Sequence, residues 1–127
     1  MGTRATGTVQ VSDWEESAYA EAEGQAKLAR ATSQAVFGGE LEGSGRCEWL
    51  LTYPAEGPAS FVGVQSFDGS LSGRAGTFVL ELRGVFDEQG PHVSWSVVPG
   101  SGSRELAGLT GTGGYESADL VLDYEIA

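Results

Sequence analysis

Two glutamates stand out as the residues best suited to acid–base chemistry. Glu48 falls in the alternating segment 47–53 and Glu81 in the alternating segment 77–86, each on the polar phase of its segment. A carboxylate buried in an apolar interior has a raised pKa and can act as a general acid or base. Glu48 and Glu81 are therefore predicted catalytic residues if the polar phase faces inward. With the opposite phase inward, they belong to a solvated outer face with weak cross-strand ion pairs.

Tyr53 is the third predicted catalytic residue, because a phenol on an apolar ring can orient the carbonyl group of a ligand. It lies on the apolar phase of its segment, and this phase predicts a set of ligand-binding residues over several segments. These are Cys47, Trp49, Phe61, Gln65, Phe78, Trp95 and Tyr124. The alternative is that the same side chains fill a core and leave no room for a ligand.

The sequence contains no pattern typical of a nucleophilic catalytic site or a metal site. His92 is the one histidine and Cys47 the one cysteine, and nothing in the sequence places them together. The usual zinc sets need more His and Cys ligands, and neither a calcium-loop pattern nor a Gly-x-Ser-x-Gly elbow is present. We therefore predict no metal site and no cofactor.

The charge of the chain argues against polyanionic partners. The formal net charge is −11, with one lysine and six scattered arginines. Binding to nucleic acids or anionic membranes depends on clustered basic residues, so we expect neither partner. No stretch approaches the roughly 20 apolar residues that span a bilayer. A single cysteine rules out an internal disulfide, and we expect a cytoplasmic protein.

Alternation with period two, interrupted by glycine, is typical of many short strands. We predict one all-β domain over residues 1–127 with about seven or eight strands. The predicted strands are 6–11, 27–37, 47–53, 60–67, 77–86, 92–98 and 120–126. Over 14–23 the pattern fits either a short capped helix or an acidic loop held by Trp14 and Tyr19.

A short motif of leucine beside glycine recurs at 40–43, 70–73 and 105–108. It predicts tight turns in which glycine takes a positive φ and leucine plugs the rim of a barrel. Glycines inside strands, at Gly43, Gly45, Gly63 and Gly84, either curve the sheet or leave space for a ligand. Closure also removes exposed strand edges, so we favour a small antiparallel closed barrel over a sandwich.

Several runs resemble a bacterial family of small proteins, the domain of unknown function 3224. They are residues 28–31, 59–63, 69–80, 95–103, 105–109 and 122–125, and the resemblance covers nearly the whole chain. It implies a barrel of about eight strands of the allene-oxide-cyclase type, a fold shared with plant dirigent proteins and some bacterial cyclases. Glu48 and Glu105 match positions that are commonly acidic in the family.

Enzymes of this wider fold mostly use no cofactor and hold a reactive hydrophobic molecule in an aromatic-lined barrel. The resemblance therefore implies that the chain binds a hydrophobic small molecule as a cofactor-free cyclase or isomerase. A non-catalytic carrier or sensor, or an interaction protein acting through its surface, are the alternatives, because fold does not determine function. Assembly into a homo-oligomer stays open.

Overall fold

The computed structural model describes residues 2–127. It contains eight strands and one turn of 3₁₀ helix, η1 (Arg104–Leu106). The strands are β1 (Thr3–Ala20), β2 (Lys27–Gly39), β3 (Leu41–Tyr53), β4 (Ala59–Leu71), β5 (Arg74–Asp87), β6 (Gly90–Val97), β7 (Leu109–Glu116) and β8 (Asp119–Ile126). No helix among these residues is long and apolar enough to cross a membrane.

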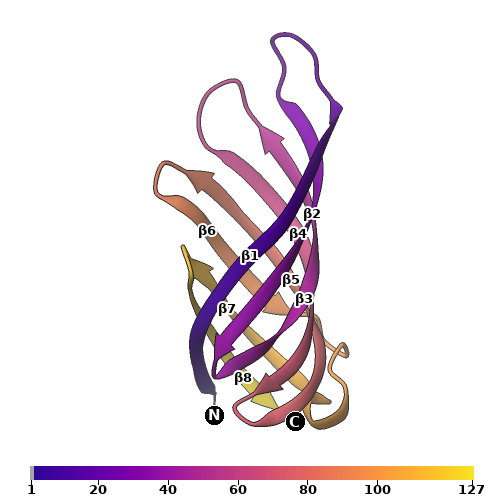
Figure 1. Ribbon diagram of the computed structural model, residues 1–127, viewed down its shortest axis with the longest axis vertical. Helices are drawn as coiled ribbons and strands as arrows, with labels where there is room; N and C mark the ends of the chain where they lie inside the picture. Colours follow the sequence, from indigo (N-terminus) through magenta and orange to yellow (C-terminus); the bar gives the residue numbers. More distant parts are fainter. Residues whose placement is uncertain (1) are drawn as a thin grey trace.

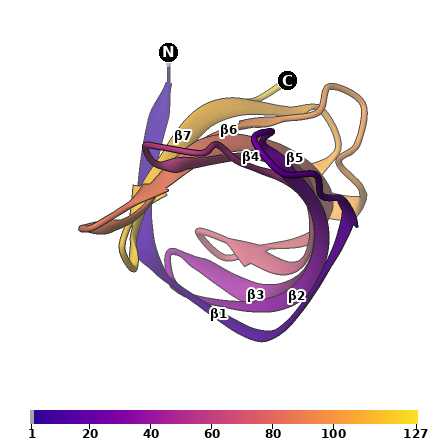
Figure 2. The same cartoon turned by 90° about the horizontal axis from the view of Figure 1, so that it is seen from above.

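The strands form one antiparallel sheet that closes into a ring. Each strand pairs with its sequence neighbours, and β1 also pairs with β8, from Thr3 opposite Tyr124 to Thr8 opposite Asp119. Figure 2 looks along this ring. The predicted all-β architecture of about eight antiparallel strands is confirmed. Strand β7 was missed because its sequence, with Gly111, Gly113 and Gly114, has few side chains to alternate.

The apolar phase of the strands faces the inside of the ring. It supplies almost all of the buried core, including Phe37, Phe67, Phe78, Leu80 and Trp95. The reversed phase, which would have buried Glu48 and Glu81, is wrong: both side chains are exposed on the outer surface.

Strand β1 continues to Ala20, so both the helix and the loop predicted for the segment 14–23 are wrong over residues 14–20. Residues 15–18 and Ala20 pair with β2, after an irregularity between Ser12 and Glu15. There, residues 13 and 14 lie opposite the single residue Ser33, and Asp13 has a φ of 54°. This is a β-bulge, and its extra residue reverses which positions of β1 face inward. Glu16 thus lies opposite the inward-facing Ala31.

The glycines inside strands mark places where neighbouring backbones approach closely. At Gly43, Gly45 and Gly84 an added Cβ would overlap the carbonyl oxygen of Asp68, Ser66 or His92. At Gly63 it would lie 2.7 Å from the carbonyl oxygen of Glu48. Of the two predicted roles, the structure therefore favours strand curvature and close approach over space for a ligand.

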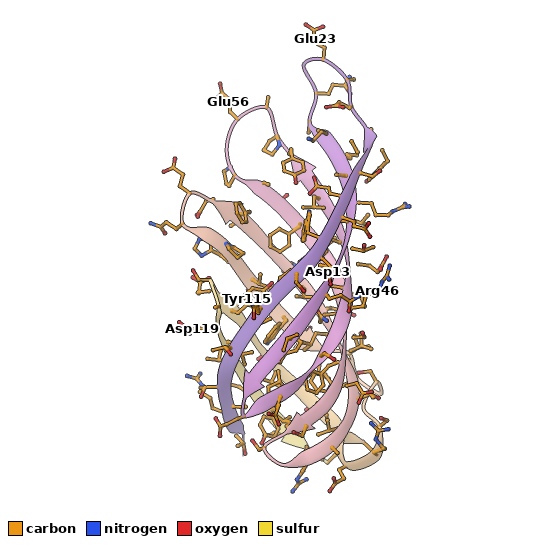
Figure 3. The ribbon with its side chains drawn as sticks, in the orientation of Figure 1. Asp13, Glu23, Arg46, Glu56, Tyr115 and Asp119 are labelled. Atoms are coloured by element: carbon orange, nitrogen blue, oxygen red, sulfur yellow. The ribbon has the colours of Figure 1, made fainter. Side chains whose placement is uncertain are left out.

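The two ends of the ring differ, as seen in Figure 1. At the lower end, beside both termini, the leucines of the recurring motif (Leu41, Leu71 and Leu106) are fully buried. Gly73 and Gly108 in the adjacent turns have positive φ angles. The predicted leucine plug is confirmed, but the predicted turn glycine is wrong for the first motif, since Gly43 lies inside β3 and has no positive φ. The upper end carries staggered hairpins, and Glu23 and Glu56 lie at the tips of the two that reach furthest (Figure 3).

Candidate ligand-binding site

The interior of the ring is packed through most of its length and hollow at the upper end. A cavity of about 400 Å³ opens there between β1, β3, β4, β5, β6 and β7. We call it the end pocket. Its lining residues are Val11, Trp14, Glu16, Trp49, Leu51, Tyr53, Ala59, Phe61, Phe86, Pro91 and Tyr115. The volume falls in the range of small-molecule sites.

Aromatic rings form most of the pocket wall and support one another. The Trp49 ring lies 5.1 Å from the Phe61 ring, edge to face, and 5.7 Å from the Trp14 ring. Trp49 is held from below, because its Nε1 donates a 2.9 Å hydrogen bond to Ser33 Oγ, and both residues are buried. Rings fixed in this way present a rigid apolar surface to the pocket.

Glu16 supplies the one carboxylate that lines the end pocket. Its Oε1 accepts a 2.9 Å hydrogen bond from Trp14 Nε1, and its Oε2 accepts a 2.6 Å hydrogen bond from the Tyr53 hydroxyl. A carboxylate can accept about four hydrogen bonds. Glu16 is therefore oriented by two protein donors and keeps acceptor capacity for a ligand.

The two phenols that line the pocket stay protonated at neutral pH. Burial, followed by the hydrogen bond to Glu16, raises the pKa of Tyr53 to about 12. Burial also raises the pKa of Tyr115. Both can therefore donate a hydrogen bond, as Tyr53 does to Glu16.

The structure brings three of the predicted site residues together in the end pocket: Tyr53, Trp49 and Phe61. Four others, Cys47, Gln65, Phe78 and Trp95, are buried in the packed interior below it. Tyr124 lies at the lower end, beside Ser72 and Arg74. The predicted residues are thus divided by height along the ring, with three that line the end pocket and five that lie below it.

Polar atoms of the packed interior are satisfied by the protein itself. Gln65 Nε2 donates to the carbonyl oxygen of Ser66 at 2.7 Å, and Trp95 Nε1 donates to that of Val121 at 3.1 Å. Burial raises the pKa of the Cys47 thiol to about 12, so this cysteine is protonated and unreactive at neutral pH. These side chains have a structural explanation without a ligand.

Glu48 and Glu81 do not reach the end pocket. Glu48 forms a 2.8 Å ion pair with Arg46 on the outer face, with both side chains more than half exposed. Glu81 is exposed on the outer face of β5. Neither carboxylate can act on a molecule held in the end pocket.

Sequence reasoning missed Glu16 as a site residue, counted Phe86 only among the residues that line or fill the interior, and placed Trp14 in a short helix or an acidic loop. Trp14 and Glu16 face the pocket because of the bulge at Asp13. Phe86 lines the pocket although it is 55% exposed.

His92 joins three strands near the mouth of the pocket. Its Nδ1 lies 2.9 Å from Glu116 Oε2, and its Nε2 lies 3.0 Å from Asp87 Oδ1. The hydrogen bonds to Glu116 and Asp87 raise the pKa of His92. The Gln89 amide and His92 lower the pKa of Asp87.

This cluster predicts a pH dependence of stability. The raised pKa of His92 stabilises the folded chain below the unfolded value of about 6.5, and this contribution is lost as the pH rises through the folded value. In urea titrations between about pH 5 and 9, the stability advantage of the wild type over His92→Gln should shrink as the pH rises. An advantage that stays constant over this range contradicts the prediction.

Within residues 2–127, no group of three or more His, Cys, Asp or Glu side chains is arranged to hold a metal ion.

Residues 5–126 match the family described as "Protein of unknown function (DUF3224)". A solved structure from Shewanella oneidensis MR-1, a protein of unknown function from the same family, shares 31% sequence identity. The match covers 100% of this chain and 99% of that chain, with a TM-score of 0.86. No curated protein matches the chain.

Proposed function

The chain belongs to the DUF3224 family, and on the geometry of the end pocket we propose that it binds a small, mainly apolar molecule that carries a hydrogen-bond donor. The observation behind the proposal is one oriented carboxylate, Glu16, in a pocket of about 400 Å³ walled by aromatic rings. Small-molecule sites commonly combine an apolar wall with a few placed polar groups.

The donor that fits this pocket best is an ammonium group. Glu16 has acceptor capacity left, and aromatic faces attract cations. The loops at the upper end add negative charge, because Glu21, Glu23, Glu56 and Glu88 lie in them. A negative rim raises the local concentration of cationic ligands and repels anionic ones.

The fold also supports this proposal, because it provides a filled lower part and an open upper end. We propose that the ring is a closed barrel of the allene-oxide-cyclase type, supported by the β1–β8 pairing and the packed interior. In such a barrel the lower part acts as a solid base, and the ligand occupies the open end. The residues that contact it are then Trp14, Glu16, Tyr53 and Phe61.

The test uses three probes of similar shape: phenylpropylamine, phenylpropanol and phenylpropanoate. Their binding is followed by the fluorescence of Trp14 and Trp49, which line the pocket. We expect the amine to bind best and the carboxylate worst. Glu16→Gln should weaken amine binding by about tenfold or more, since a hydrogen bond to a charged group contributes roughly 1.5–3 kcal/mol.

Glu15→Gln is the matched control, because it removes the same charge from the neighbouring position. Glu15 lies opposite Thr32, on the outward phase, whereas Glu16 lies opposite the inward-facing Ala31. We expect Glu15→Gln to leave amine binding close to that of the wild type. If none of the three probes binds, the pocket proposal fails. If the three bind equally, the donor preference fails.

A cofactor-free isomerase or cyclase is the second candidate. Glu16 and Tyr53 are 2.6 Å apart and could act as a proton acceptor and a carbonyl-binding donor on one molecule. Catalysis needs Glu16 as the base, in place of Glu48 or Glu81. Conversion of a bound ligand by the wild type but not by Glu16→Gln would favour this candidate, and recovery of unchanged ligand favours a carrier.

A further inference from the structure

The outer face of the sheet carries a trough that runs across strands β2 to β6 (Arg30 to Ser96). Two rows of side chains form its walls. In one row Arg30, Leu50, Val62 and Arg83 lie side by side, strand by strand. In the other row Glu48, Val64 and Glu81 lie side by side. We call these the arginine row and the glutamate row.

The centre of this face is apolar and open to solvent. Leu50, Val62 and Val64 are 46%, 49% and 51% exposed. Val62 and Val64 are two residues apart on β4, so both point outward and together span the trough. Contiguous exposed apolar groups with a polar border are typical of interaction sites.

The charged border of this face is balanced, which is unusual on a chain with a net charge of −11. Two arginines and two glutamates line the trough. Glu48 already pairs with Arg46, but Glu81 and Arg83 form no ion pair with any residue in 2–127. Arg83 and Glu81 thus offer one free charge of each sign, on the same strand.

The two charges on β5 are complementary to each other across a two-fold axis. Consider two copies placed face to face, related by a two-fold axis that runs along the trough. The arginine row of each copy then faces the glutamate row of the other: Arg83 meets the partner copy's Glu81, and Val62 meets its Val64. A two-fold interface repeats every such contact twice.

The other two-fold axis within this face gives the opposite result. An axis along β4 exchanges β3 with β5, and it would place Glu48 against the partner copy's Glu81. Like charges that face each other are destabilising. The register of the sheet therefore selects one of the two symmetric arrangements.

We propose that this face is the interface of a homodimer, with the two-fold axis along the trough. Aligned packing of two sheets, about 30° apart, suits an exposed apolar centre of this kind. The interface lies on the outside of the ring, so its formation does not depend on the ligand-binding function proposed for the end pocket.

The test is a charge exchange within one strand, followed by sedimentation velocity over a range of protein concentrations. Arg83→Glu should weaken dimerisation by at least about tenfold, because it creates two Glu–Glu contacts in each dimer. The double variant Arg83→Glu with Glu81→Arg should restore dimerisation, since it reverses both partners of each pair. A general effect on folding would give no such rescue.

Two valines provide an apolar test with a matched control. Val62→Asp places a charge in the centre of the face and should yield monomers. Val36→Asp alters a valine that is 56% exposed on β2, opposite Ser44 and outside the trough, and should leave the dimer intact. A wild type that sediments as a monomer at every concentration overturns the proposal. A dimer that survives both Arg83→Glu and Val62→Asp overturns it as well.

Discussion

Replacement of Gly69 by alanine is expected to prevent stable folding. Gly69 lies between Gly43 on β3 and Gly76 on β5, so three strands meet there without side chains. An alanine Cβ at Gly69 would overlap the carbonyl oxygen of Glu42 and lie 2.6 Å from the Cα atom of Gly43. Both neighbours are backbone atoms, which cannot move without shifting a strand.

We expect Gly69→Ala to lower the free energy of unfolding by at least about 4 kcal/mol, a value found where backbone or core geometry is broken. This is a large share of the roughly 5–15 kcal/mol that stabilises a typical domain. Circular dichroism and urea denaturation measure it. Gly57→Ala is the control, since nothing lies within 4 Å of its added Cβ.

Gly57 has a φ of 99°, so the control substitution carries a conformational cost of about 1–2 kcal/mol. A loss at Gly69 that clearly exceeds this cost is therefore due to crowding between strands. Equal losses in the two variants would mean that close approach of β3 and β4 at Gly69 does not matter for stability.

Truncation of Phe67 to alanine has the second largest expected effect. Phe67 is 1% exposed and stacks on Phe78 at a ring distance of 4.6 Å, with Phe37 edge-on at 5.4 Å. Removing a buried phenylalanine ring typically costs about 3–5 kcal/mol, because apolar contact is lost and a cavity remains.

Phe86→Ala is the matched control for this substitution. Phe86 is 55% exposed at the pocket mouth, so its truncation should cost less than about 1 kcal/mol of stability. It should instead weaken binding of the amine probe. Urea denaturation of the two variants gives the comparison. If both variants lose the same stability, the ring interior around Phe67 is not the packed core that the structure describes.

Much of the fold could be predicted from alternation, because most strands keep a strict period of two. In β5, Phe78, Leu80 and Leu82 are all buried, as their spacing predicts. The leucines of the recurring motif could also be placed at the rim, and for Leu71 and Leu106 the motif glycine does lie in a turn. Which phase of these strands faces inward stayed open in the sequence, and it is the structure that places Glu48 and Glu81 on the outward phase.

The end pocket could not be predicted in the same way, because it depends on a local change of phase in β1. Val9 and Val11 would place Asp13 and Glu15 inward if alternation continued, and Glu16 outward. The bulge at Asp13 reverses this order. Aspartate tolerates a positive φ better than most residues, but that preference alone does not locate a bulge.

The sequence also could not separate the hollow part of the ring from the filled part. Trp49 and Trp95 are both buried aromatic residues on the inward phase, and only Trp49 lines the pocket. The difference arises from height along the ring and from the uneven lengths of the strands. Both the height of a residue along the ring and the strand lengths depend on the register between several strands. The sequence of one segment does not determine that register.

The pairing of β1 with β8 also bears on how the chain reaches its native state. Thr3 and Tyr124 face each other across this seam although almost the whole chain separates them. Closing so long a loop costs more entropy than any hairpin in the sheet, so contacts of this kind form slowly. Until the seam forms, β1 and β8 are open edges that another chain can pair with. The same bonds that complete the ring thus set the interval during which a newly made chain is most exposed to aggregation.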